Sequence, residues 1–162
     1  MMRRYGWLTG VALLAMPTLI AAMEPDPLGG RYGHEFSEPA YAAVWEVRRV
    51  GAGWQAGTVA DDTYSAAHEM SPAARRAFWE KMGWPAATST EADCVTWGEA
   101  PLSLTDMLEG KPVATGPDAF GSDLVCHVPA HVRKDIDWLA DSSEDWFFYN
   151  PVAGVMEVRR VP

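Results

Sequence analysis

The chain has 162 residues, of which 48% are hydrophobic and 22% are charged, with 13 Lys and Arg against 22 Asp and Glu. This composition is typical of a globular protein and excludes a disordered chain. The net charge of -9 repels nucleic acid, so we exclude nucleic-acid binding.

The first 22 residues have the layout of a secretory signal peptide. A cationic start at Arg3 and Arg4 precedes an apolar centre over residues 7–16 and a small-residue exit at Ala22. The run from Trp7 to Ala22 is interrupted by Pro17 and is shorter than the roughly 20 apolar residues of a membrane-spanning helix. We expect a cleaved Sec-type signal peptide over residues 1–22 and a periplasmic or secreted product without stable membrane insertion. No cysteine lies near residue 23, so no lipid anchor is expected; an uncleaved membrane anchor is the main alternative.

Cleavage would remove two of the 13 basic residues and no acidic residue, which gives a net charge of -11 on about 140 residues. A chain of this length favours one domain. Residues 23–40 contain three prolines and three glycines, which predicts an irregular N-terminal arm, and residues 41–162 are expected to form a single globular domain. An acidic surface keeps an exported protein soluble and also attracts cationic partners.

Strand and helix patterns alternate along the expected domain. Residues 41–50 are rich in β-forming side chains, and a Gly-Ala-Gly turn separates them from residues 54–59, so these two segments predict a hairpin. Ser71 and Pro72 provide the N-cap and the first turn of a helix that ends at Gly83.

The remaining elements predict a mixed fold. They are, in chain order, a strand over 93–99, a short helix over 103–109, a strand over 124–128, a helix from 129 to about 141, and strands over 146–149 and 155–161. We therefore expect an α+β fold in which an antiparallel sheet carries two main helices packed on one face.

One segment occurs twice. Residues 44–50 read VWEVRRV and residues 155–161 read VMEVRRV, so six of seven positions are identical. If the two strands pair antiparallel, each glutamate faces an arginine across the pair, which stabilises a sheet. We expect such a pair, and the alternative is a basic strip of four arginines for an anionic ligand.

The chain contains two cysteines, Cys94 and Cys126. An even number of cysteines in an exported chain predicts a disulfide. Closing a loop of about 33 residues would stabilise the fold by roughly 3 to 4 kcal/mol. The alternative is a catalytic thiol at Cys126 that uses the adjacent His127 as its base.

No motif in the chain specifies a reaction or a metal. The closest histidines, His127 and His131, have Pro129 between them, which interrupts the helix that would place both on one face. The sequence contains neither a GxSxG nucleophile elbow nor a glycine-rich phosphate loop. We expect no catalytic residue, no metal ligand and no cofactor.

Residues 135–146 form the most concentrated acidic and aromatic stretch of the chain. Tryptophan is enriched at the energetic centres of protein interfaces, and carboxylates beside it would favour a basic partner. The predicted partner-binding residues are Asp135, Asp137, Trp138, Asp141, Glu144, Asp145 and Trp146.

In size, export signal and charge, the chain is similar to bacterial periplasmic inhibitors and immunity proteins, which neutralise cationic enzymes that attack the cell wall or membrane. This similarity extends to no residue motif and assigns no site residues. It implies a small exported binding protein whose acidic C-terminal surface meets a basic protein partner. Two other functions remain open: a small envelope hydrolase that uses His127 or His131, and a carbohydrate-binding module, which would need coplanar exposed tryptophans.

Overall fold

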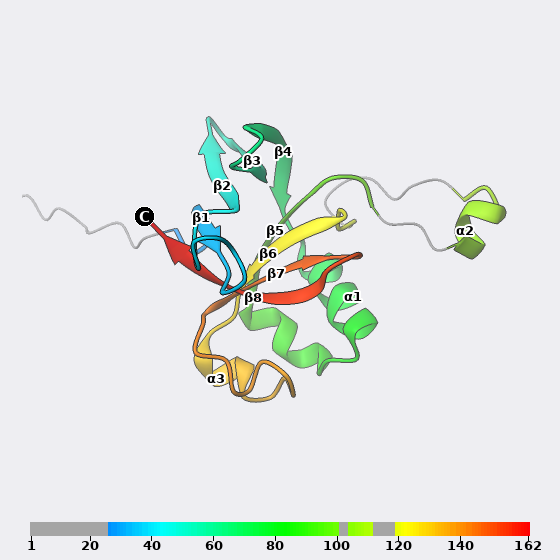
Figure 1. The fold of residues 1–162 in the computed structure, drawn as a ribbon. Helices are drawn as coiled ribbons and strands as arrows, with labels where there is room; N and C mark the ends of the chain where they lie inside the picture. The colour runs from blue at the N-terminus through cyan, green and yellow to red at the C-terminus, as the bar shows by residue number, and fades with distance from the viewer. Residues whose placement is uncertain (1–25, 101–103, 112–118) are drawn as a thin grey trace, which may run out of the picture.

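The computed structural model describes residues 26–100, 104–111 and 119–162. The expected signal peptide lies outside these residues. Within them the backbone forms a closed barrel of eight antiparallel strands, in which each strand pairs with the next and β8 pairs with β1 (Figure 1). The prediction of an α+β fold with two main helices on one face of a sheet is therefore wrong.

The strands of the barrel are short and regular. They are β1 Gly30–Gly33, β2 Trp45–Val50, β3 Gly53–Thr58, β4 Thr63–Glu69, β5 Asp93–Trp97, β6 Asp123–His127, β7 Trp146–Asn150 and β8 Gly154–Val161. The helical elements are α1 Pro72–Met82, the 3-10 helix η1 Ala86–Glu91, α2 Leu104–Leu108 and α3 Ala130–Arg133.

The two strands that sequence analysis missed are the ones that close the barrel. β1 lies within residues 23–40, for which an irregular arm was expected, and β4 was assigned to no element. β1 pairs with both β2 and β8, and β4 connects β3 to β5. Without β1 and β4, the strands predicted from the sequence could form only an open sheet.

The expected second main helix is also corrected. α3 is a single turn, and the chain continues after it in three-residue turns. The N–H of Ile136 donates to the carbonyl of Arg133, and the N–H of Leu139 donates to the carbonyl of Ile136. These turns bury apolar side chains at intervals of three to four residues. An α-helix has the same spacing, so the sequence pattern predicted a helix here.

The two copies of the repeated segment lie in β2 and β8, which do not pair. β1 lies between them and pairs with both. Glu46 of β2 instead forms an ion pair with Arg31 of β1 at 3.5 Å, and Arg159 of β8 pairs with Glu144. The predicted direct pairing of the two segments is wrong because it omitted β1.

Strands β5, β6 and β7 are buried on both faces. Because side chains alternate across a strand, Val95, Val125 and Phe148 enter the barrel interior, whereas Cys94 and Phe147 belong to a second core outside it. Two apolar cores therefore share one set of strands.

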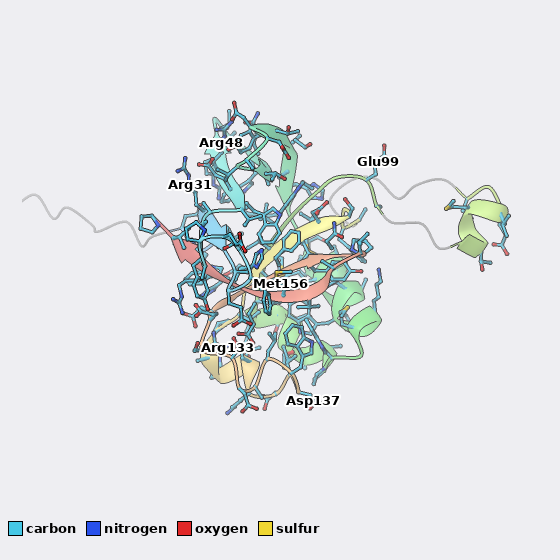
Figure 2. The ribbon with its side chains drawn as sticks, in the orientation of Figure 1. Arg31, Arg48, Glu99, Arg133, Asp137 and Met156 are labelled. Carbon is cyan, nitrogen blue, oxygen red and sulfur yellow. A yellow bond between two sulfur atoms is a disulfide. The ribbon has the colours of Figure 1, made fainter. Side chains whose placement is uncertain are left out.

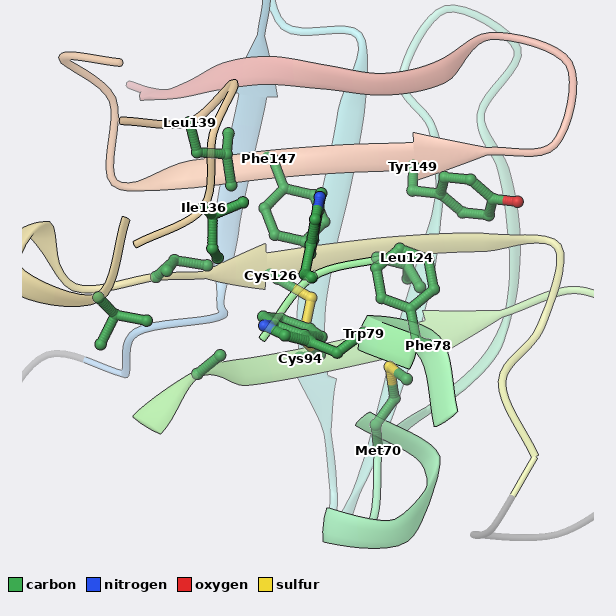
Figure 3. Packing of buried hydrophobic residues seen from close by; sticks show 14 of the residues in the cluster. Met70, Phe78, Trp79, Cys94, Leu124, Cys126, Ile136, Leu139, Phe147 and Tyr149 are labelled. Carbon is green, nitrogen blue, oxygen red and sulfur yellow. A yellow bond between two sulfur atoms is a disulfide. The ribbon is translucent and has the colours of Figure 1, made fainter. Parts of the chain in front are cut away.

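Helix α1 covers the outer core. Ser71 caps it by accepting a hydrogen bond from the Ala74 N–H at 3.1 Å, and Gly83 ends it in the left-handed conformation, with φ of 72°. Phe78 and Trp79 are fully buried beneath the helix. Figure 3 shows Trp79 beside the disulfide, between the helix and the strands.

The predicted disulfide between Cys94 and Cys126 is confirmed. The two residues lie directly opposite each other on β5 and β6, and both are almost completely buried. The disulfide also excludes the alternative of a catalytic thiol, because neither sulfur is free.

Replacing both cysteines by alanine should lower the free energy of unfolding by about 3 kcal/mol, because the unfolded chain is no longer constrained by the crosslink. The barrel should still form, since β5 and β6 remain joined by their backbone hydrogen bonds. Urea unfolding with and without a reductant measures the effect. The reductant should lower the urea midpoint of the native protein and leave the midpoint of the double variant unchanged. Equal midpoints of the two proteins without reductant would contradict the prediction.

Residues 26–29 cover the end of the barrel at which β1 begins, which we call the closed end. Leu28 is 3% exposed and belongs to the interior core. Its carbonyl accepts a hydrogen bond from the Tyr32 hydroxyl at 2.5 Å, and the carbonyl of Pro27 accepts one from Trp146 Nε1 at 2.8 Å. This segment therefore acts as a plug.

Asp26 holds the plug to the barrel wall. Its Oδ1 accepts hydrogen bonds from the backbone N–H groups of Leu28 at 2.9 Å and Gly29 at 3.3 Å, and its Oδ2 accepts one from Arg49 Nε at 3.3 Å. Arg160 Nη2 donates to the Asp26 carbonyl at 2.8 Å. Burial raises the pKa of Asp26, but the hydrogen bonds from Leu28, Arg49 and Gly29 outweigh it, and the net pKa is lowered.

Asp26→Asn should lower the free energy of unfolding by about 1 kcal/mol at pH 7, because the charge-assisted bond to Arg49 is lost. A carboxyl group with a lowered pKa stabilises the fold above its ordinary pKa of 3.8 and loses this effect as the pH falls through the lowered value. The difference between variant and native protein should therefore shrink below about pH 4. Asp61→Asn, at an exposed position, is the control; a difference that is constant with pH would contradict the prediction.

Candidate functional site

A groove of about 460 Å³ lies along the outer face of β8. One wall is the loop between β1 and β2, and the other is the segment between α3 and β7. Met156 of β8, which also lines the groove, is labelled near the centre of Figure 2, and Asp137 lies at the α3 end of the molecule. The groove-lining side chains that bear on its chemistry are Glu35, Phe36, Tyr41, Trp138, Glu144 and Glu157.

The wall formed by the β1–β2 loop is built around Tyr41. Its backbone has φ of 60°, a conformation that costs energy for a bulky side chain. The Tyr41 N–H donates to the carbonyl of His34 at 2.9 Å, which holds the turn. The same loop presents Phe36 to solvent, 75% exposed.

The opposite wall is held by Arg133, a buried arginine with 7% exposure. Its Nη1 donates to the carbonyl of Glu144, to Asp145 Oδ1 at 2.5 Å and to the carbonyl of Val128 at 3.4 Å. Arg133 thereby holds the segment that leads into β7.

One guanidinium group already lies in the groove. Arg159 of β8 donates to both carboxylate oxygens of Glu144, from Nε at 3.0 and 3.2 Å and from Nη2 at 2.5 Å. Its guanidinium carbon lies 4.1 Å from the centre of the Tyr41 ring. The Glu144 side chain is 11% exposed, so this carboxylate is fully committed within the chain.

The other charged groups of the groove have no such partner. Among the described residues, Glu35 and Glu157 form no ion pair or side-chain hydrogen bond. Trp138 is 43% exposed, and no aromatic ring or cation of the described chain packs on it. The groove therefore combines uncovered aromatic surface with unpaired negative charge.

The structure divides the predicted partner-binding residues. Trp138 and Glu144 line the groove. Asp135, Asp137 and Asp141 are exposed near its α3 wall, and they do not line it.

The last two predicted residues are committed to other contacts. Asp145 bonds to Arg133. Trp146 lies at the closed end of the barrel, where its ring is 6.3 Å from the ring of Tyr32. Side chains of neighbouring residues in a strand point to opposite faces, and Trp146 takes the inward face.

Of the six groove residues that bear on its chemistry, four were not predicted from the sequence: Glu35, Phe36, Tyr41 and Glu157. Three of them lie in or next to the segment that was expected to be irregular. The available signal was Phe36, a lone aromatic residue within a stretch rich in glycine, proline and charge. Nothing in the sequence connects it to Trp138.

In the described part of the chain, neither histidine considered for catalysis has the surroundings of a catalytic base. His131 is exposed and pairs with Glu91, with 2.6 Å between Nε2 and Oε2. His127 is half-buried at the closed end, its ring 5.4 Å from Trp146, and its buried Nδ1 has no hydrogen-bond partner. Neither is hydrogen-bonded to a nucleophilic side chain in the described ranges. Within those ranges, no group of His, Cys, Asp and Glu is arranged to hold a metal ion.

Comparison of the chain with protein-family models, with curated proteins and with solved structures gives no match. None of the helices in residues 26–100, 104–111 and 119–162 is long and apolar enough to cross a bilayer.

His127 should titrate below its ordinary pKa of 6.5, because its burial disfavours the charged ring more than Asp145 and Asp93 favour it. The unfolded chain then binds a proton at a higher pH than the folded chain. The free energy of unfolding should therefore fall as the pH drops from about 6.5 toward the lowered pKa. Urea unfolding at pH 7.5 and at lower pH checks this, with His127→Gln as the comparison. The variant should lose this part of the pH dependence, and an unchanged dependence would contradict the prediction.

Proposed function

We propose that the chain is a small exported acidic binding protein of the inhibitory or immunity type, which neutralises a cationic enzyme that attacks the cell envelope. The observation that carries this proposal is the β8 groove, where the exposed Trp138 and Phe36 lie beside the unpaired carboxylates of Glu35 and Glu157. The partner would dock on this face.

The chemistry of the groove suits a protein partner. Exposed aromatic side chains bury large areas when a partner covers them and are enriched among the residues that dominate binding energy. Unpaired carboxylates at the same place repel anionic surfaces and favour a basic one. Export would leave a net charge of -11, which would accelerate the encounter with a cationic enzyme.

The disulfide supports the proposed compartment. Cysteine pairs persist in oxidising environments such as the periplasm and the extracellular medium. A buried Cys94–Cys126 bridge accords with periplasmic or secreted localisation of the mature chain.

The two alternatives receive less support. A sugar-binding platform would need coplanar exposed tryptophans, and of the seven tryptophans in the described ranges Trp138 alone is exposed. A hydrolase would need His127 or His131 beside a nucleophile, and their contacts in the described chain are with aromatic and acidic groups.

Binding to a basic cell-wall muramidase should be salt-sensitive. The mature protein is titrated by calorimetry into a basic muramidase and, separately, into an acidic one, at low salt and at about 0.3 M salt. We expect binding to the basic enzyme, loss of its wall-lysing activity, and affinity about ten-fold weaker at high salt. Equal binding to both enzymes, or affinity that salt leaves unchanged, would refute the proposal.

Binding of the basic muramidase should depend on side chains of the groove. Trp138→Ala should weaken the complex by about 2 kcal/mol, or roughly 30-fold, because an aromatic anchor is removed. The matched control is Leu108→Ala, which removes an 80% exposed apolar side chain on α2, outside the groove. Equal affinities for the Trp138 variant and the native protein would place the contact elsewhere.

A further inference from the structure

We propose that the groove recognises an arginine side chain of its basic partner, whose guanidinium group stacks on Trp138 and pairs with Glu35 and Glu157. This inference rests on the proposed function and names the chemical group that the groove binds.

The chain itself repeatedly places arginine on aromatic rings. All four arginines of the repeated segment do so: the guanidinium carbon lies 3.9 Å from the ring centre of Tyr64 for Arg48, 3.9 Å from Trp54 for Arg49, 4.1 Å from Tyr41 for Arg159 and 5.0 Å from Trp146 for Arg160. Arg49 and Arg159 are also paired with carboxylates. An aromatic face beside a carboxylate is therefore an arginine site in this fold.

One of these internal arginine sites is part of the groove. The guanidinium group of Arg159 lies over the Tyr41 ring and donates hydrogen bonds to both carboxylate oxygens of Glu144. Tyr41 and Glu144 both line the groove. The groove surface thus already accommodates one guanidinium group with ring and carboxylate contacts.

The remaining groove residues repeat this chemistry without an internal cation. Trp138 supplies an uncovered ring, and Glu35 and Glu157 supply carboxylates that no described residue pairs with. Arg159 neutralises Glu144 alone, so two of the three groove carboxylates keep their charge. The groove is therefore complementary to a cationic group.

Arginine fits these contacts better than lysine. A guanidinium group is planar, stacks on tryptophan and binds carboxylates through two parallel hydrogen bonds, whereas an ammonium group is a strongly hydrated point charge. Phe36 at the same groove provides apolar surface for the methylene groups of an arginine stem. An acidic or phosphorylated segment would meet unpaired carboxylates and be repelled.

The test uses two small probes of equal shape. N-acetyl-arginine amide and its uncharged isostere N-acetyl-citrulline amide are titrated into the full mature protein, and the indole N–H signal of Trp138 is followed by NMR. Trp138→Phe identifies the signal. The arginine probe should shift it with a dissociation constant of about 10 mM, as a cation on one ring with exposed carboxylates predicts, and the citrulline probe should not.

Carboxylate variants separate the groove from the general acidity of the chain. Glu157→Gln and Glu35→Gln should each weaken arginine binding about five-fold. Asp141→Asn is the matched control, because it removes the same charge from an exposed residue outside the groove, and it should leave the affinity unchanged. If Glu157→Gln lowers the dispersion of the NMR spectrum, Glu35→Gln, in an exposed loop position, decides the question.

Three results would overturn the inference: no shift of the Trp138 signal up to about 50 mM arginine probe, equal shifts with citrulline, or equal weakening by Asp141→Asn. These outcomes are separate from a failure of the proposed function. Salt-sensitive muramidase binding that arginine amide does not displace would refute the arginine site and leave the binding function intact. Arginine binding without any basic protein partner would refute the inhibitory function and leave the site.

Discussion

The burial of β5, β6 and β7 on both faces is the constraint on which the rest of the molecule depends. Val95 and Val125 need an interior, which the closed barrel provides, and Cys94 and Phe147 need an outer cover, which α1 provides. A strand that is apolar on both faces cannot lie at the surface without a large loss of hydrophobic stabilisation. Barrel closure, the position of α1 and the buried disulfide all satisfy this requirement.

The same constraint places the groove on the outside of the barrel. Trp54, Trp97 and Phe148 occupy the interior core, and the segment around Leu28 closes one end. α1 packs against the outer face of the central strands, whereas β8 carries the groove between two loops. Loops on a rigid barrel can present side chains to a partner without disturbing the core, which is the arrangement that the proposed binding function requires.

Most of the strands and helix α1 could be predicted from the sequence, but the closure of the sheet into a barrel could not. The hairpin of β2 and β3, helix α1 and the strands that carry the cysteines have strong signals: turn glycines, a Ser-Pro helix start and apolar runs. β1 has four residues, two of them glycine, and β4 is mostly polar or small side chains with partial exposure. Neither segment has the β-branched, alternating pattern of a typical strand, because contacts with neighbouring strands hold them in the sheet.

The sequence by itself determined the disulfide partners, since it contains two cysteines, and the acidic balance of the chain. It also located Trp138 and Glu144 within a stretch rich in acids and aromatic residues. Only the tertiary structure placed Glu35 and Phe36 in one groove with Trp138 and Glu157, which lie more than 100 residues away in the sequence. It also decided that Trp146 packs against the interior core of the barrel. The physical reason is that local patterns record which side chains need burial, whereas barrel closure decides which distant loops meet.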